Sequence, residues 1–156
     1  RHTASRLAEE GASVIVHGRR EARVAEAVEF VKNRQKGNGR VEGVVADLSS
    51  LRGMNHLCDE VLARTDRLDC LINNAGKSER EPRRIFNEEL HHGEDGYEHT
   101  FTVSALAPYV ITGRLLDLVA KTPGGEGRVV NVSSYAAANS LDFDNLQVCR
   151  PDSGGT

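Results

Sequence analysis

The chain has 156 residues, of which 38% are hydrophobic and 28% are charged, and its formal net charge is −3. This composition is typical of a globular protein and excludes the disordered and fibrous classes. No basic block stands out, so nothing electrostatic indicates nucleic-acid binding. No apolar run approaches the ~20 residues that a transmembrane helix needs, and no secretory signal pattern is present. The length suits one domain, residues 1–156.

The predicted elements alternate between helix and strand along the chain. Apolar residues at helical spacing predict helices at 2–10, 20–33, from Ser49 or Ser50 onward, and at 97–120. Short β-branched or apolar runs predict strands at 12–18, 41–48, 68–73 and 128–133. This alternation with apolar strands predicts an α/β fold, with parallel strands and helices on both faces.

Two further features bear on packing. The stretch 77–95 is charged and irregular, which predicts a surface insertion. Pro108 is expected to kink the long helix because it lacks an N–H group. Five apolar positions of this helix are expected to face the core: Phe101, Leu106, Tyr109, Val110 and Leu116. In the third predicted helix, the positions expected inward are Leu51, Met54, Cys58, Val61 and Leu62.

Cysteines and histidines do not indicate a metal site. The three cysteines, Cys58, Cys70 and Cys149, are odd in number and widely spaced, which favours a reducing compartment over a disulfide framework. Cys70 stands in an apolar run and is expected in the core. The histidines of the charged stretch have no familiar ligand spacing, so we predict no metal there. His17, in the first strand, is expected to have a hydrogen-bonded ring rather than a catalytic role.

Polar or small residues follow each of the four predicted strands. They are Gly18, Arg19 and Arg20, then Asp47, then Asn73, Asn74, Ala75 and Gly76, and finally Ser133 and Ser134. In an open parallel α/β sheet, ligands bind beyond the carboxyl ends of the strands. Four such ends together predict a binding site. The amides of "LDCLINNAG" are notable because a buried amide without partners is costly.

Three segments together resemble the short-chain dehydrogenase/reductase family: "DCLINNAG", "VVADLSS" and "GRVVNVSS". The stretch 77–95 and the helix start "DGYEHTF" are similar to its retinol-dehydrogenase-like branch. The resemblance covers essentially the whole chain. It implies a Rossmann-type doubly wound parallel sheet in three α/β/α layers, and an oxidoreductase that uses a nicotinamide cofactor.

The resemblance implies roles for the strand-end residues. Asp47 matches the acid that holds the adenine amino group, with the Leu48 backbone beside it. Asn73, Asn74, Ala75 and Gly76 match the segment that packs along the adenosine ribose and braces the central sheet. Ser134 matches the serine that hydrogen-bonds the substrate oxygen. Ser104 holds the position of an asparagine that anchors a relay water; a serine can also hydrogen-bond a water, but with a shorter reach, which favours a weakened or non-catalytic variant more than an asparagine would.

Arg19 bears on the choice of cofactor. An acid at this strand end would bind a ribose 2′-hydroxyl, whereas an arginine suits a 2′-phosphate. Gly18 and Arg19 therefore favour NADP(H), with NAD(H) as the alternative. The remaining alternative is that Arg19 and Arg20 merely flank a surface helix, and this is the expectation for Arg20.

Two family features are not in these residues. The glycine-rich phosphate loop is expected before Arg1, together with a first strand that lies between 12–18 and 68–73 in the sheet. The catalytic tyrosine-x-x-x-lysine is expected after Thr156, because the last lysine is Lys121. We therefore expect an incomplete fold, a sheet split at the missing strand, and no activity from these 156 residues alone.

The leading hypothesis is the central part of an oxidoreductase that transfers a hydride between NADP(H) and a carbonyl or secondary alcohol. Its partner would be a small, lipophilic molecule, without metal or nucleic acid, and the full-length protein would form a homodimer or homotetramer. The long helix could form that interface by family analogy. The cytoplasm is the favoured compartment, with membrane association of the full-length chain left open. The alternative is a non-catalytic nucleotide-binding or scaffold protein on the same fold.

Overall fold

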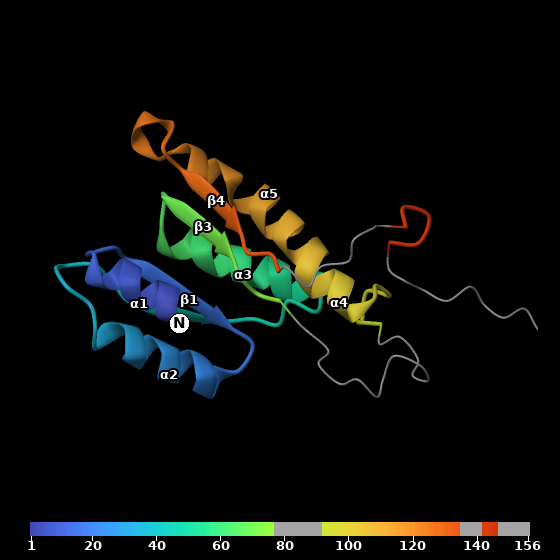
Figure 1. The fold of residues 1–156 in the computed structure, drawn as a ribbon, viewed down its shortest axis with the longest axis horizontal. Coiled ribbons are helices and arrows are strands. Elements are labelled where there is room, and N and C mark those ends of the chain that lie inside the picture. Colours follow the sequence, from blue (N-terminus) through green and yellow to red (C-terminus); the bar gives the residue numbers. More distant parts are fainter. Residues whose placement is uncertain (77–91, 135–141, 147–156) are drawn as a thin grey trace, which may run out of the picture. The chain divides into compact units, whose positions relative to one another are not determined.

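The computed structural model describes residues 1–76, 92–134 and 142–146. Its strands are β1 (Val14–Gly18), β2 (Val41–Val45), β3 (Cys70–Asn73) and β4 (Arg128–Asn131) (Figure 1). Its helices are α1 (His2–Glu9), α2 (Glu21–Lys32), α3 (Leu51–Arg64), α4 (His99–Phe101) and α5 (Ala107–Ala120), with a π-helical segment η1 (Thr102–Leu106) and a short 3₁₀ turn η2 (Pro123–Gly125). The predicted alternation of helix and strand is confirmed.

The strands form two separate parallel pairs. β1 pairs with β2, with Val14 opposite Val41 and Gly18 opposite Val45. β3 pairs with β4, with Cys70 opposite Arg128. No ladder joins β1 to β3 among the described residues. The chain accordingly divides into two compact units: unit 1 (1–48 and 52–66) and unit 2 (49–51 and 67–156).

In unit 1, α1 and α2 pack against the β1–β2 pair. The buried centre consists of Ala8 from α1, Val31 from α2 and Val41 from β2. At Gly43 the helix comes very close, because a methyl group added there would lie 2.5 Å from a methyl carbon of Val24. Only glycine lets α2 approach the strand so closely, and this close packing holds the strand ends in place.

The apolar face of α3 is close to the predicted one. Met54, Leu57, Cys58 and Val61 are buried. The prediction for Leu62 was wrong, since its side chain is 43% exposed. Residues 54, 57, 58 and 61 follow the i, i+3, i+4, i+7 pattern of one helix face, and position 62 lies at the margin of that face.

In unit 2, α5 packs against β3 and β4. The predicted positions Tyr109 and Leu116 were wrong, because they are 79% and 51% exposed. The buried side chains of α5 are Ala107, Ile111, Leu115, Leu118 and Val119, so apolar residues lie on more than one face of this helix and apolar spacing alone does not select the inward face. The wide turn of the π-helical segment precedes it. The buried residues Thr102 and Ala107 are five positions apart, and the Ala107 N–H donates to the Thr102 carbonyl across this wide turn. This turn is one residue wider than an ordinary helical turn and keeps Thr102 and Ala107 on one face. The irregular turn lies directly before Pro108, where a kink was expected.

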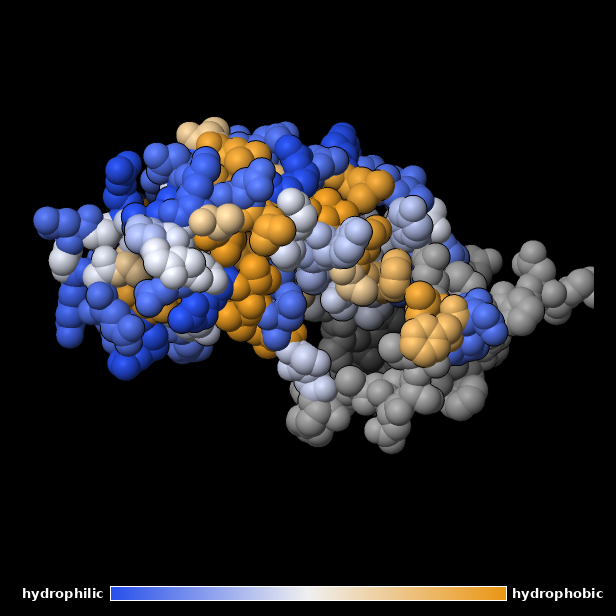
Figure 2. Space-filling view, turned by 90° about the horizontal axis from the view of Figure 1, so that it is seen from above, coloured by the Kyte–Doolittle hydropathy of each residue, from blue (hydrophilic) through white to orange (hydrophobic). Residues whose placement is uncertain are grey.

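Unit 2 leaves part of its sheet exposed. Cys70 in β3 is exposed, so the prediction that it lies in the core was wrong. Val130 in β4 and Val132 just beyond it are 42% and 56% exposed. Figure 2 shows apolar residues among the surface atoms of the face it presents. Strands of parallel sheets are normally buried on both faces, and the described residues of this pair do not reach that burial.

The stretch His99–Ala120, which joins α4, η1 and α5, is a largely apolar helix of 22 residues. By length and composition alone this is enough to cross a membrane, so the sequence prediction that no stretch approaches this length does not hold. A core helix passes the same test, and α5 packs against two strands.

Candidate functional site

In unit 1, the candidate residues follow two paired strands at one edge. Arg19 comes directly after β1 and Asp47 comes two residues after β2. Because Gly18 lies opposite Val45 in a parallel pair, both residues leave the sheet at the same carboxyl end. Arg19 and Asp47 are exposed, whereas Leu48 is buried. The arrangement places a cation and a carboxylate at one strand edge, which is the placement predicted from the sequence.

The ring of His17 contacts the same strand end. Its Nε2 lies 2.9 Å from the carbonyl oxygen of Ala46, so this nitrogen donates the hydrogen bond. Burial lowers the pKa of His17 below its ordinary value, although the hydrogen bond to Ala46 and the nearby Asp47 carboxylate both raise it. The expectation of a hydrogen-bonded ring is confirmed.

The backbone after β2 is also constrained by α3. A methyl group added at Gly53 would overlap the carbonyl oxygen of Asp47. Gly53 therefore lets the first turn of α3 lie against the strand end. The backbone of Asp47 is packed in this way while its side chain reaches solvent.

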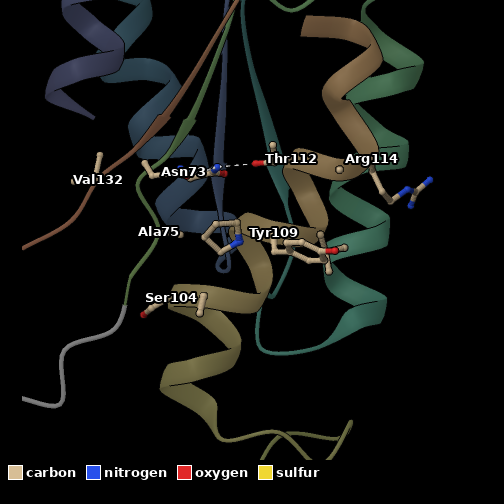
Figure 3. A pocket seen from close by; sticks show the side chains of 12 residues that line it. Asn73, Ala75, Ser104, Tyr109, Thr112, Arg114 and Val132 are labelled. Atoms are coloured by element: carbon tan, nitrogen blue, oxygen red, sulfur yellow. Dashed lines mark hydrogen bonds between the residues drawn. The ribbon is translucent and has the colours of Figure 1, made fainter. Parts of the chain in front are cut away.

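In unit 2, the first of the two amides at the end of β3 has specific partners. The Asn73 Nδ2 donates to Asn131 Oδ1 at 2.8 Å and to Thr112 Oγ1 at 3.0 Å. These bonds join β3 to β4 and to α5, and Figure 3 shows the side chain of Asn73 directed toward Thr112. Asn74 is exposed. The Asn73 amide thus braces the strand end, so its placement after an apolar strand does not leave it without partners.

An open hollow of about 720 Å³ lies beside this brace within unit 2. It is lined by Asn73, Ala75, Ser104, Ala105, Pro108, Tyr109, Val110, Thr112, Gly113, Arg114, Asn131 and Val132. Ser104 belongs to the π-helical segment and is exposed, and its side chain lies at this hollow (Figure 3). In the same view Arg114 extends away from the strand ends. The structure therefore brings together Asn73, Ala75 and Ser104 among the predicted residues.

The other predicted residues of unit 2 lie at the same strand ends but do not line this hollow. Asn74 and Gly76 are exposed after β3, and Ser134 is exposed three residues after the end of β4. Tyr135, Cys149 and His91 lie outside the described residues. In the part of the chain that the structure describes, no group of three or more potential metal-ligating side chains comes together.

Sequence reasoning missed several polar residues that shape this unit. Asn131 and Thr112 are the partners of Asn73. Asp95 accepts a hydrogen bond from the Leu51 N–H at 2.7 Å, which caps the first residue of α3. Glu98 accepts bonds from two backbone N–H groups at the start of α4. The Asn in "VVNVSS" was a visible signal, because an amide inside an apolar strand requires a partner.

A comparison with protein families decides what kind of protein carries these sites. The model of the short chain dehydrogenase family matches residues 1–144. The chain belongs to this family. The resemblance found in "DCLINNAG", "VVADLSS" and "GRVVNVSS" is thereby confirmed.

Relatives and solved structures agree with this membership in the short-chain dehydrogenase family. Retinol dehydrogenase 14 of Mus musculus is 34% identical over 160 residues, which cover 94% of this chain and 45% of that protein. The chain thus spans less than half the length of this curated relative. The likeness confirms the retinol-dehydrogenase-like branch.

Two solved structures of this family show the fold. A Caenorhabditis elegans short-chain dehydrogenase/reductase of unknown function, solved with cofactor, is 29% identical, with a TM-score of 0.68 over 90% of this chain and 50% of its own. The Pseudomonas aeruginosa RhlG/NADP complex is 26% identical, with a TM-score of 0.65 over 81% of this chain and 46% of its own. The two parallel pairs are thus parts of a Rossmann-type α/β fold, as predicted.

Proposed function

We propose that the full-length protein is an oxidoreductase that transfers a hydride between NADP(H) and a carbonyl or secondary-alcohol carbon, and that residues 1–156 belong to its dinucleotide-binding domain. The observation that carries the proposal is the placement of Arg19 and Asp47 at one carboxyl edge of the β1–β2 pair. Family membership and the NADP complex of the RhlG relative support it.

The residues at this edge fit the adenosine end of NADP(H). Arg19 is exposed, and within the described ranges its guanidinium forms no hydrogen bond or ion pair. A guanidinium offers several donors to a phosphate, and so suits the 2′-phosphate. The Asp47 carboxylate can accept from the adenine amino group, and Asn74, Ala75 and Gly76 offer an exposed backbone for the ribose. When bound, the nicotinamide would supply or accept the hydride.

Ser134 is the proposed residue for the substrate oxygen. It is exposed after the carboxyl end of β4, where a parallel sheet places its reacting groups. A hydroxyl there can donate to a substrate carbonyl and so stabilise the negative charge that develops on its oxygen. Ser104 lines the hollow and is the proposed replacement for a relay asparagine, with a shorter reach.

The substrate class follows from the relatives. Because the mouse protein is named a retinol dehydrogenase, we extend the proposal to lipophilic alcohols and aldehydes. We further propose that the full-length protein forms a homodimer or homotetramer and resides in the cytoplasm. Light scattering tests the oligomeric state, and cell fractionation tests the compartment. Recovery of the full-length protein in the membrane fraction would contradict the cytoplasmic part.

The proposal is tested by NADPH oxidation with a lipophilic aldehyde as the substrate, using the full-length protein. Ser134→Ala should lower kcat by about 10²-fold or more, the scale of losing one donor to a developing oxyanion. Ser133→Ala is the matched control, since Ser133 is also exposed at the same strand end. Equal rates in wild type and Ser134→Ala would refute the role of Ser134. Tight NADPH binding without turnover on any carbonyl would favour the non-catalytic alternative.

The preference for NADP(H) is tested separately through Arg19. The ratio of NADPH to NADH affinity should fall in Arg19→Ala by about 10-fold or more, because a charge-assisted bond contributes roughly 1.5–3 kcal/mol. Arg20→Ala, at the exposed residue that precedes α2, should leave the ratio unchanged. An unchanged preference in Arg19→Ala would refute the argument from this arginine.

A further inference from the structure

Ala46, the residue before Asp47, is held by β1 through both its backbone N–H and its backbone carbonyl. The Ala46 N–H donates to the Gly18 carbonyl at 3.1 Å, and the Ala46 carbonyl accepts from His17 Nε2 at 2.9 Å. The second bond is made by a side chain, after the β2 ladder has ended at Val45. His17 thus continues the pairing of the two strands for one more peptide group.

This bond has a direct consequence for Asp47. The Ala46 carbonyl belongs to the planar peptide group whose nitrogen is that of Asp47, so fixing its direction fixes the backbone entering Asp47. On the other side, the Asp47 carbonyl lies against the backbone at Gly53, with no room for a methyl group. The Cα of Asp47 is therefore fixed from both neighbours, and its carboxylate has little freedom beyond its own side-chain rotamers.

The protonation state of the His17 ring is consistent with a fixed hydrogen bond to the Ala46 carbonyl. Burial lowers the pKa of His17, which favours the neutral ring at neutral pH. A neutral ring with Nε2–H as the donor has one defined tautomer, so the bond to Ala46 is directional. The Asp47 carboxylate lies close enough to act on that ring electrostatically.

We propose that His17 is a positioning residue for cofactor selection: by holding the Ala46 carbonyl, it orients the Asp47 carboxylate toward the adenine amino group of NADP(H). The inference rests on the proposed function, in which Asp47 binds this amino group. His17 itself touches no reacting atom. Its effect is on the discrimination between adenine and a base that lacks the amino group.

The test compares the binding of two cofactors to the full-length protein. The probes are NADPH and its analogue in which hypoxanthine replaces adenine, so that the exocyclic amino group is absent. Nicotinamide fluorescence reports the Kd of both. Wild type should prefer NADPH, and Asp47→Ala should lose most of this preference.

His17→Leu removes the donor at similar volume and should reduce the preference by about three- to tenfold, within the range of one ordinary hydrogen bond. His17→Gln keeps an N–H donor and should retain most of the preference. The double variant His17→Leu/Asp47→Ala should lose no more than Asp47→Ala alone, because both act through one carboxylate. If His17→Leu does not fold, His17→Met is the second donor-free variant.

The outcomes separate the positioning role of His17 from the proposed function, in which Asp47 binds the adenine amino group. If Asp47→Ala loses the preference while the donor-free variants keep it, His17 has no positioning role. If His17→Gln falls as far as His17→Leu, the effect is general destabilisation and the inference is overturned. If wild type binds neither probe, the proposed function fails and the inference fails with it.

Discussion

The two units fix their strand ends by different means. In unit 1 the end of β2 is held through backbone groups: the Ala46 carbonyl by His17, and the Asp47 carbonyl by its close approach to Gly53. In unit 2 the end of β3 is held through the side chain of Asn73, which bonds to Thr112 and Asn131.

This difference determines what each end can offer to a ligand. Backbone restraint leaves the Asp47 side chain exposed at the edge of the β1–β2 pair. In unit 2 the Asn73 amide group is committed to the brace, so its exposed neighbours Asn74 and Ala75 are the groups on offer. Unit 1 should therefore be sensitive to added volume, and unit 2 to lost hydrogen bonds.

The largest change in the free energy of unfolding is expected from a substitution at Gly53. Gly53→Ala places a methyl group onto the Asp47 carbonyl and should lower the free energy of unfolding by about 1–3 kcal/mol, the usual cost of overpacking. Chemical denaturation of the full-length protein measures it. Gly113→Ala in α5 is the matched control, because nothing lies within 4 Å of the added methyl. It should raise the free energy of unfolding by about 0.5–1 kcal/mol. Equal effects at the two glycines would contradict the close contact at Gly53.

Asn73 gives the corresponding test in unit 2. Asn73→Ala removes the donor to two acceptors and should lower the free energy of unfolding by about 1–3 kcal/mol. Asn74→Ala, at the exposed neighbour, should change it by less than about 0.5 kcal/mol. A cost at Asn74 that matches the cost at Asn73 would show that the brace does not depend on the Asn73 amide.

A smaller effect is expected at Asp95, whose carboxylate accepts from the Leu51 N–H at the start of α3. Asp95→Ala should lower the free energy of unfolding by about 1 kcal/mol, as for other lost helix caps. Asp117→Ala, on the exposed side of α5, is the control for removing an acidic residue. Thermal unfolding that shifts equally in both variants would argue against a specific cap.

The smallest effect is a pH dependence that originates in unit 1. Because the folded pKa of His17 is lowered from 6.5, the unfolded chain binds more protons below about pH 6.5. The stabilisation contributed by the neutral His17 ring is therefore complete above about pH 6.5, and it is lost as the pH falls toward the folded pKa of His17. Denaturation curves from about pH 7.5 to about pH 5.5 should show a shallower decline in His17→Gln than in wild type. His56→Gln on the exposed face of α3 is the matched histidine replacement. Parallel declines in wild type and His17→Gln would exclude this contribution.

The sequence predicted the helices and strands well, because apolar runs and helical spacing are local signals. The strand-end positions of Arg19, Asp47 and Ser134 followed from the same pattern. The sequence showed that Asn73 and Asn131 each need a partner, but it did not show that they pair, since Thr112 and Asn131 lie 39 and 58 residues from Asn73 and meet it only through packing.

The inward face of the long helix was also not predictable by counting. Apolar side chains lie on more than one face of α5, because Tyr109 and Leu116 are exposed whereas Ile111 and Leu115 are buried, so apolar spacing does not identify the inward face. The exposure of Cys70 has a similar origin, because an apolar run does not say how many layers cover it.

The π-helical segment is a wide turn that accommodates one additional residue within a continuous helix. Deleting one residue between Thr102 and Leu106 would place Thr102 and Ala107 four positions apart, so both would stay on one face of an ordinary helix. The packing of α5 on β3 and β4 would survive, because the deletion lies before Ala107. The wide turn that carries Ser104 would close to an ordinary turn, which would change the direction of its hydroxyl relative to the hollow. The position of this hydroxyl therefore depends on a count of residues as well as on its chemical identity.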